Sequence, residues 1–540
     1  MNATSLHHHH HHHYHHLLPS KPPPPFTKLT SLKTTPPSSS SSSLTANPPP
    51  AAPLTEEKPT RHRPTATTTD DTEYTAFWDY QHLFMSQRSE AVEPVVLRVV
   101  EGAVPRDFPS GTYYLAGPGL FSDDHGSTVH PLDGHGYLRS FSIDGGAGEV
   151  RFKARYVETE AQAEERDAET GRWRFTHRGP FSVLKGGRRV GNVKVMKNVA
   201  NTSVLCWGGR LLCMWEGGDP YEIDPRSLAT RGRFDIIPGD ADEATSSGPP
   251  FHGWLDAVDV AALFLKPVLH GVFKMPEKRI LSHYKIDEKR GRLLIMSCRA
   301  EDMLLPRSNF TFYELDSDFK LLQKRDFTIP DHLMIHDWAF TDNHYILVGN
   351  RIKLDIPGYD WKSGKLDPAF MNAVKGEESL LPHLFQISIK MDKKGKCQDC
   401  SITASEQWKK PSDFPAINPS FSGTKNSHIY VATTSRFRKH LPHFPFDSVV
   451  KLDSNLDKPV AIWSAGYRQF IGEPVFVPKG VEEDDGYVLV VEYAISVQRC
   501  YLVILDARRI GRDDAVVAKL EVPKHLNFPL GFHGFWAANN

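Results

Sequence analysis

The sequence predicts an all-β protein of the β-propeller class, and two observations lead to this prediction. From about residue 95 to the end of the chain, short β-branched, aromatic and aliphatic runs are separated by Gly, Asp and Asn turns. Many of these runs stop at a turn such as Asp316-Ser-Asp318 and then resume, which is typical of propeller blades, and few stretches show a helical pattern. A β-sandwich is the alternative, but the runs outnumber the strands that one sandwich usually holds.

The first 70 residues differ in composition from the rest. They contain a histidine run from His7 to His13, clusters of Pro and Ser, and no Asp or Glu before Glu56. An acid-free, Ser/Pro-rich start is typical of an organelle transit peptide, and the lack of a continuous apolar region argues against a secretion signal. We expect residues 1–70 to be a disordered transit peptide and linker, and residues 71–540 to form one domain in which order begins near Tyr74.

The overall composition excludes several classes of protein. Of 540 residues, 39% are hydrophobic and 24% charged, and the formal net charge is -1. A large core is therefore possible, and the basic excess typical of nucleic-acid binding is missing. No uncharged apolar run reaches about 18 residues, so we expect no membrane-spanning helix. Six cysteines in so long a chain favour a reducing compartment, and Cys397-Gln-Asp-Cys400 lacks the second pair of a zinc site.

Turn residues locate individual hairpins within the domain. Gly208-Gly209 separates two β-rich halves of residues 201–216 and suits a tight primed turn, so we expect a hairpin there. Further strands are expected in order at 292–298, 310–315 and 320–329; at 344–348; at 429–433, 449–452 and 460–463; and at 487–493, 500–505 and 517–520.

One segment interrupts the β pattern. Residues 253–273 are densely apolar, residues 260–265 contain no polar side chain, and Pro267 should interrupt a helix there. Two interpretations stay open, a buried insertion helix and a membrane-dipping patch at the mouth of an apolar tunnel. The second predicts partly exposed side chains at Leu263, Phe264, Leu265, Val268, Leu269 and Phe273.

His336 is the first candidate for a functional residue. It lies in an apolar strand pattern with Ile335, Trp338 and Phe340, so we expect its ring to point inward. A buried imidazole needs partners for both ring nitrogens, and a metal on one with a carboxylate on the other would supply them. Since a single histidine in such a setting is more often a hydrogen-bonded core residue, the metal hypothesis needs further ligands.

Several motifs in a fixed order supply these further candidates. They are Ser282-His283-Tyr-Lys-Ile-Asp287, Met334-Ile-His336-Asp337, Phe414-Pro-Ala-Ile-Asn-Pro419, Gly472-Glu-Pro-Val-Phe-Val-Pro478 and Gly531-Phe-His533-Gly534. In this order they resemble the motifs of the carotenoid cleavage dioxygenases. The resemblance extends from about Tyr74 to Trp536 and is strongest to plant members that act early in strigolactone synthesis.

The resemblance implies a seven-bladed propeller with a helical cap, and a non-haem Fe(2+) ion held by four histidines from different blades. His283, His336 and His533 match three of these ligands. Glu216 and Glu473 match the carboxylates that orient His336 and His533. Imidazole suits Fe(II), and a carboxylate behind each ring fixes its tautomer and its direction.

The same resemblance implies a dioxygenase that adds both atoms of O2 across one carotenoid double bond and releases two carbonyl products. The expected substrate is 9-cis-β-carotene, cleaved at the 9',10' bond to β-ionone and 9-cis-β-apo-10'-carotenal in a plastid. Since a polyene offers no hydrogen bonds, a tunnel would recognise it by shape and apolar area. The expected partners are this substrate, O2 and the plastid membrane surface, with no nucleic acid and no obligate protein partner.

The chain departs from the family pattern after His336. The family's third histidine ligand has no counterpart, and a segment of about one to two blades, each of about 40 to 45 residues, is missing between Gly358 and Tyr359. His383 matches a position that is not a ligand, and Asp413 matches the carboxylate that supports the missing ligand. Because each blade packs on its neighbours, the loss predicts an incomplete propeller. Two hypotheses follow: an iron dioxygenase, or a catalytically impaired isoform or truncated gene model.

Overall fold

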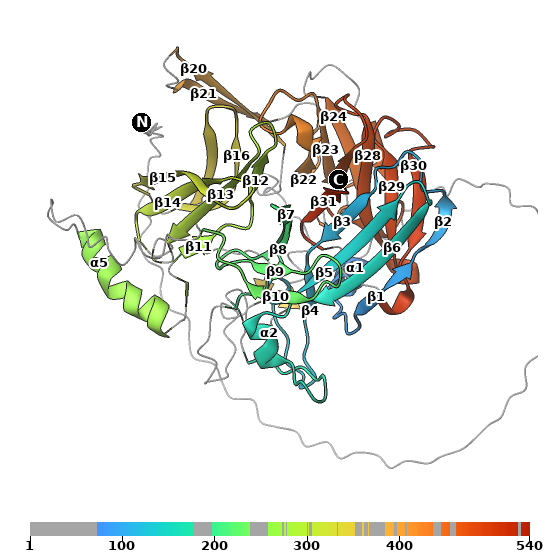
Figure 1. Cartoon of the computed structure of the whole chain (residues 1–540), viewed down its shortest axis with the longest axis horizontal. Helices are drawn as coiled ribbons and strands as arrows, with labels where there is room; N and C mark the ends of the chain where they lie inside the picture. The colour runs from blue at the N-terminus through green and yellow to red at the C-terminus, as the bar shows by residue number, and fades with distance from the viewer. Residues whose placement is uncertain are drawn as a thin grey trace, which may run out of the picture. The chain divides into compact units, whose positions relative to one another are not determined.

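Both ends of the folded chain meet in one antiparallel sheet (Figure 1). β3 (Gly111–Leu115) pairs with β5 (His135–Asp144) on one side and with the last strand, β31 (Gly534–Ala538), on the other. The remaining strands of this sheet are β1 (Ala91–Val96), β4 (Pro118–Leu120) and β6 (Glu149–Tyr156). A sheet built from both chain ends joins the first and last elements of the fold, as a radial array of blades requires.

The structure is a computed structural model. It describes residues 73–539 except 177–178, 180–196, 238–256, 273–274, 277, 300, 302–304, 332, 352–358, 361–364, 367–383, 394–396, 405–407, 436–443, 454–460 and 527–530. The predicted transit peptide and linker, residues 1–70, lie outside the described residues, as does Gly358 at the predicted gap.

Four further antiparallel sheets of four or more strands follow in chain order. The second sheet contains β7 (Ser203–Trp207), β8 (Arg210–Met214), β9 (Tyr221–Ile223) and β10 (Thr230–Arg233). The third contains β11 (Lys278–Ile280), β12 (Lys285–Asp287), β13 (Arg292–Arg299), β14 (Ser308–Leu315) and β15 (Leu321–Ile329). The fourth contains β22 (Ser412–Ala416), β23 (His428–Thr433), β24 (Ser448–Asp453) and β25 (Ala461–Ser464). The fifth contains β26 (Gln469–Ile471), β27 (Val475–Pro478), β28 (Gly486–Ala494), β29 (Arg499–Asp506), β30 (Val516–Glu521) and, from the N-terminal part, β2 (Arg98–Gly102).

Between the third and fourth sheets, the described residues form only two-stranded pieces. These are β16 (Leu333–Phe340) with β17 (Tyr345–Arg351), β18 (Tyr359–Asp360) with β19 (Lys365–Leu366), and β20 (Phe385–Met391) with β21 (Cys397–Ala404). The all-β, propeller-like arrangement is thus confirmed with five sheets of blade size. Seven blades and a helical cap stay predictions.

Apolar clusters join four pairs of neighbouring sheets. One cluster joins the first sheet to the fifth, others join the first to the second, the second to the third, and the fourth to the fifth. Ile335 and Trp338 of β16 pack on the third sheet. At Gly423, an added Cβ would lie 2.5 Å from the Phe340 ring, so the end of β16 also lies against the connection between β22 and β23.

β28 shows why these sheets stay together. All nine of its residues are buried. Val488 and Val490 pack in the cluster shared with the fourth sheet, whereas Leu489 and Val491 pack in the cluster shared with the first. Successive side chains of a strand point to opposite faces, so an apolar run with no alternation is what a strand covered on both faces needs. Burying each such side chain contributes roughly 1.5 to 3 kcal/mol.

Helices are few among the described residues. They are α1 (Glu73–Leu83), α2 (Glu160–Glu165), α5 (Ala257–Lys266) with a π-helical continuation (Pro267–Val272), and short 3-10 turns at Pro131–Asp133, Pro419–Phe421, Ile495–Val497 and Lys524–Leu526. The α-helical part of α5 stops at the residue before Pro267, where the proline ring disfavours the α conformation. None of the described helices is long and apolar enough to span a bilayer.

The individual strand predictions agree with this structure. The Gly208-Gly209 hairpin is confirmed as β7 and β8, with Trp207 opposite Arg210 across the turn. The runs predicted at 292–329, 429–463 and 487–520 form β13 to β15, β23 to β25 and β28 to β30. The first described element, α1, contains Tyr74.

Candidate metal centre

Three histidines from distant parts of the sequence lie together. Nε2 of His283 is 3.2 Å from Nε2 of His336, and the ring centroids of His283 and His533 are 4.8 Å apart. Two nitrogens that each bind one ion at about 2.1 Å and at right angles lie about 3 Å apart. The spacing of His283 and His336 therefore suits two ligands of a single metal ion.

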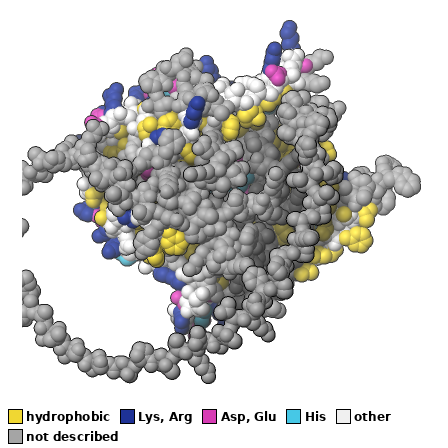
Figure 2. Space-filling view, turned by 180° about the vertical axis from the view of Figure 1, so that it is seen from behind, with side chains coloured by type: hydrophobic (Ala, Val, Ile, Leu, Met, Phe, Trp, Pro, Cys, Tyr) yellow, Lys and Arg dark blue, Asp and Glu magenta, His cyan; other side chains and the backbone are white. Residues whose placement is uncertain are grey.

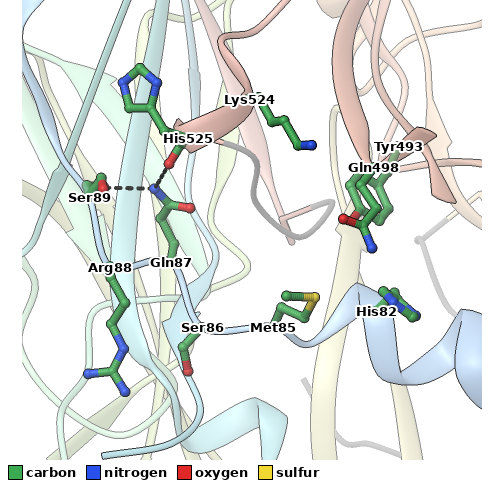
Figure 3. A pocket seen from close by; sticks show the side chains of 10 residues that line it. All are labelled: His82, Met85, Ser86, Gln87, Arg88, Ser89, Tyr493, Gln498, Lys524 and His525. Carbon is green, nitrogen blue, oxygen red and sulfur yellow. Dashed lines mark hydrogen bonds between the residues drawn. The ribbon is translucent and has the colours of Figure 1, made fainter. Parts of the chain in front are cut away.

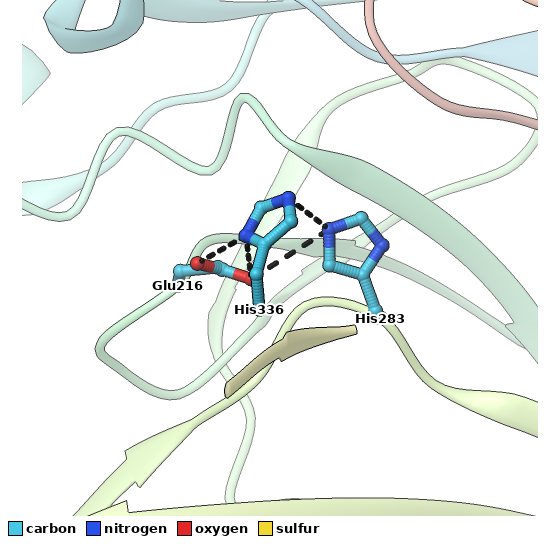
Figure 4. Close-up of side chains that lie close together, drawn as sticks. All are labelled: Glu216, His283 and His336. Atoms are coloured by element: carbon cyan, nitrogen blue, oxygen red, sulfur yellow. Dashed lines mark hydrogen bonds and ion pairs between the residues drawn. The ribbon is translucent and has the colours of Figure 1, made fainter. Parts of the chain in front are cut away.

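Two of these imidazoles have a carboxylate within hydrogen-bonding distance of Nδ1. Nδ1 of His336 lies 3.2 Å from Oε2 of Glu216 (Figure 4), and Nδ1 of His533 lies 2.8 Å from Oε1 of Glu473. Glu473 also accepts a 2.7 Å hydrogen bond from the backbone N–H of Gly534, so it holds both the ring and its strand. An imidazole that donates Nδ1–H keeps its lone pair on Nε2. The contacts with Glu216 and Glu473 therefore leave Nε2 of His336 and of His533 as the metal-binding nitrogen.

Burial and nearby charges set the protonation of the three rings. Burial lowers the pKa of His283 to about 4, so this ring is neutral at neutral pH. The hydrogen bond with Glu216 raises the pKa of His336 above its ordinary value. Burial lowers the pKa of His533, but the charge and hydrogen bond of Glu473 outweigh it, so that pKa is raised. Because a metal needs neutral imidazole, protons compete with it more strongly at His336 and His533 than at His283.

The sheets, not the chain, bring these residues together. His283 lies between β11 and β12, His336 on β16, and His533 directly before β31. Glu216 follows β8, and Glu473 lies between β26 and β27. Among the residues that the structure describes, Glu216, His283 and His336 form a group with one possible ligand atom each within 4.8 Å of one another, and His533 is not part of this group. Imidazoles backed by carboxylates are a donor set that fits a divalent transition metal, Fe(2+) included.

Asp413 also lies beside this cluster. It is on β22, and the ring of the next residue, Phe414, has its centroid 5.8 Å from that of His533. Its Oδ1 accepts a 2.9 Å hydrogen bond from the N–H of Phe414. Within the described residues, no histidine is hydrogen-bonded to Asp413, and His383 falls outside them.

The expected burial of His336 is wrong. Its side chain is 56% exposed, although Ile335 and Trp338 on either side of it are 4% and 3% exposed. The pairing of β16 with β17 shifts between Ile335 and Trp338, and such a bulge turns His336 away from the apolar core. The same bulge carries Asp337, which no sequence motif assigned to the site. Its position directly after the candidate ligand His336 was the one sign in the sequence of a role at the site.

The apolar helix agrees only in part with the predicted membrane patch. Leu263, Phe264 and Val268 are exposed, and Figure 2 shows apolar side chains over α5, on the right of that view. Leu265 is intermediate. Leu269 is buried, so the prediction is wrong for it, because residues four apart share a helix face and Leu269 extends the face of Leu265. Phe273 lies outside the described residues.

A cavity of about 260 Å³ lies elsewhere in the structure (Figure 3). It is lined by His82, Met85, Ser86, Gln87, Arg88, Ser89, Tyr493, Gln498, Lys524 and His525. The amide nitrogen of Gln87 donates to the backbone oxygens of Ser89 and His525, at 2.9 and 3.1 Å. The cavity shares no residue with the histidine cluster, and its lining includes the charged side chains Arg88 and Lys524, which do not suit a polyene.

Comparisons with known proteins all indicate one family of oxygenases. The family model described as retinal pigment epithelial membrane protein, RPE65, matches residues 84–373 and 359–538. Carotenoid cleavage dioxygenase 7 of Arabidopsis thaliana is 52% identical over 577 positions, which cover 88% of this chain and 93% of that protein. The protein of the same name from rice is also 52% identical, and the apocarotenoid-15,15'-oxygenase of Synechocystis is 27% identical over 81% of this chain and 92% of its own.

Solved structures support the fold. A mutant of Synechocystis apocarotenoid oxygenase superposes with a TM-score of 0.63 at 23% identity, covering 86% of this chain and 99% of its own. A cobalt-substituted form of that enzyme gives a TM-score of 0.60.

The alignment with the Arabidopsis protein is also longer than the part of this chain that it covers. Since 88% of 540 residues is about 475, about 100 of the 577 aligned positions have no counterpart in this chain. The two pieces matched by the family model meet at residues 359–373, next to the predicted junction at Tyr359.

Proposed function

Because this chain belongs to the family of RPE65 and the carotenoid cleavage dioxygenases, we propose that its histidine cluster holds Fe(2+) and that it cleaves a carotenoid with O2. The substrate is 9-cis-β-carotene, and cleavage at the 9',10' bond yields β-ionone and 9-cis-β-apo-10'-carotenal for strigolactone synthesis. The identity of 52% to two plant proteins named carotenoid cleavage dioxygenase 7 supports this choice. The chloroplastic designation of both supports a plastid location.

Each residue of the cluster has a defined task in this proposal. His283, His336 and His533 offer neutral nitrogens, and Fe(2+) bound to them would supply a site at which O2 reacts. Glu216 and Glu473 keep the Nδ1 protons of His336 and His533, so that Nε2 of each ring stays free for the metal. In the balanced reaction both oxygen atoms enter the products, one at each carbon of the broken double bond, so no external reductant is needed.

The position of His283 beside both His336 and His533 is the observation that carries the proposal. The test uses the 540-residue protein, purified without oxygen and loaded with ferrous iron. Bound metal is measured, and the protein is then incubated with 9-cis and all-trans β-carotene. Iron bound in the wild type and lost in His336→Ala supports the site, and release of β-ionone from the cis isomer supports the reaction. A chain that binds no iron contradicts both.

A second candidate is a catalytically impaired isoform or a truncated gene model. It is favoured by the roughly 100 aligned positions that have no counterpart in this chain, and by the two-stranded pieces between the third and fourth sheets among the described residues. The β20–β21 hairpin also exposes Phe385, Ile387, Ile389 and Ile402. Figure 2 shows apolar side chains along the projecting arm that this hairpin forms. Exposed apolar strands of this kind are normally covered by a neighbouring sheet.

This candidate predicts weak iron binding and little activity, because a fourth imidazole and its neighbouring blade contacts are missing. Losing a carboxylate behind a ligand typically costs about 10- to 100-fold in affinity, and losing a ligand itself should cost more. Inserting the corresponding family segment between Gly358 and Tyr359 should restore both properties. Near-stoichiometric iron and steady β-ionone release by the unmodified chain would reject impairment.

Association with a plastid membrane is part of the proposal. A carotene is almost insoluble in water, so an enzyme that extracts it gains by docking on the lipid surface. The exposed Leu263, Phe264 and Val268 of the α5 segment form the apolar surface that supports this docking.

A further inference from the structure

An ion pair joins the two elements that carry His283 and His336. Nζ of Lys285 lies 2.7 Å from Oδ1 of Asp337. Lys285 begins β12 two residues after His283, and Asp337 follows His336 directly on β16. β12 belongs to the third sheet and β16 to the two-stranded piece beside it, so the pair connects two separate sheets close to both rings.

A β-bulge makes this contact possible. In a regular strand, Asp337 would point to the face opposite His336. Ile335 and Trp338 are both buried in the same apolar cluster, whereas His336 and Asp337 are both exposed, with the register shift lying between. The bulge therefore places two consecutive polar side chains on one side of β16, one toward the imidazole of His283 and one toward Lys285.

The ion pair adds little to the stability of the fold. The Lys285 and Asp337 side chains are 25% and 51% exposed, so solvent screens their attraction, and such pairs typically contribute less than about 1 kcal/mol. The apolar cluster around Trp338 already holds β16 on the third sheet. The metal centre has a stricter requirement, because its ligands must be held within about 0.5 Å of a working geometry.

We infer that the Lys285–Asp337 pair is a positioning device that sets the distance between His283 and His336 and thereby the affinity of the cluster for a divalent metal. The inference rests on the metal site proposed above. Asp337 Oδ1 also accepts a 2.7 Å hydrogen bond from the backbone N–H of Trp338, so the carboxylate is fixed to its own strand while it binds Lys285. Neither residue touches the reacting atoms, and both act through the histidines beside them.

The chain contains a matched control for this pair. Lys289 and Asp342, 3.4 Å apart, lie in the turns that follow β12 and β16, and their side chains are 63% and 50% exposed. The two pairs have the same chemistry. The control pair lies farther along the chain from His283 and His336, its lysine is more exposed, and Asp342 also lies 3.9 Å from a nitrogen of Arg290. Removing the control pair tests any general effect of a missing ion pair.

The test measures Co(2+) binding by visible absorption, which reports affinity and coordination geometry without turnover. Asp337→Asn and Lys285→Met should each raise the dissociation constant at least about 10-fold and shift the cobalt bands. The double variant should be no weaker than the weaker single variant, since both remove one interaction. Lys285→Arg, which keeps the charge and a donor, should stay within about threefold of wild type, as should Lys289→Met and Asp342→Asn.

The outcomes separate this inference from the proposed function. Cobalt affinities of Asp337→Asn and Lys285→Met equal to those of the control variants would overturn the positioning role and leave the metal site intact. A wild-type chain that binds no cobalt, or binds it equally well as His336→Ala, would contradict the proposed metal site itself. Metal-free Asp337→Asn should melt within about 2 °C of wild type, because an exposed pair contributes little. A larger drop would assign the pair to the fold and reject the positioning role.

Discussion

Replacing Glu473 by Gln tests how the last histidine is held. Glu473 accepts from Nδ1 of His533 at 2.8 Å and from the N–H of Gly534 at 2.7 Å, through its two oxygens. Gln keeps the shape but has one acceptor oxygen and no charge, so one of these two hydrogen bonds must be lost. The His533 ring or the start of β31 is then free to move, and the lone pair of Nε2 is no longer directed at the metal position.

The expected loss follows from the bond that disappears. A hydrogen bond to a charged group contributes roughly 1.5 to 3 kcal/mol. At about 1.4 kcal/mol for each factor of ten, this corresponds to a metal dissociation constant raised about 10- to 100-fold. Losses of this size are typical when a carboxylate behind a ligating histidine is removed.

The assay is a cobalt titration of metal-free protein, with bound iron measured in parallel. Glu483→Gln is the control, because its carboxylate holds the backbone N–H groups of Ser427 and His428 at 2.5 and 2.6 Å, away from the cluster. The control should leave metal affinity within about threefold of wild type, because it makes the same removal of a charge at a carboxylate that holds no histidine of the cluster. Equal metal affinity in wild type and Glu473→Gln would refute the proposed role of Glu473.

Three further predictions concern the ligands, the membrane and the location of the protein. His283→Ala or His336→Ala should weaken metal binding more than 100-fold, because each removes a bond to the ion, whereas His383→Ala should leave it unchanged; a metal titration decides between them. Leu263→Ser with Phe264→Ser should reduce binding to galactolipid vesicles several-fold, because these exposed side chains would enter the lipid. The matched control, Leu321→Ser with Leu322→Ser on β15, should not reduce vesicle binding. Equal losses of binding in the two double variants, measured by flotation, would reject α5 as the membrane-binding surface. Residues 1–70 fused to a fluorescent protein should enter plastids, and a cytosolic signal in microscopy would contradict the transit peptide.

The sequence alone determined the features that depend on local patterns. The Gly208-Gly209 hairpin, the strands from 292 to 329 and the apolar run of β28 follow from turn residues and strand periodicity, and the structure has them at the expected positions. The motifs around His283, His336 and His533 indicated a shared site before any geometry was available. They could do so because each motif is contiguous in the chain.

Only the tertiary structure decided how these pieces meet. No local pattern shows that β16 bulges at His336 and Asp337, because the bulge depends on pairing with β17 and on packing of Ile335 and Trp338 against another sheet. For the same reason the pairing of Asp337 with Lys285 and the burial of Leu269 were not predicted. Such contacts join residues far apart in the chain or elements from different sheets, and their energies exist only after the sheets have packed. The sequence therefore names the groups that can bind a metal, and the packing of the sheets sets the distances between them.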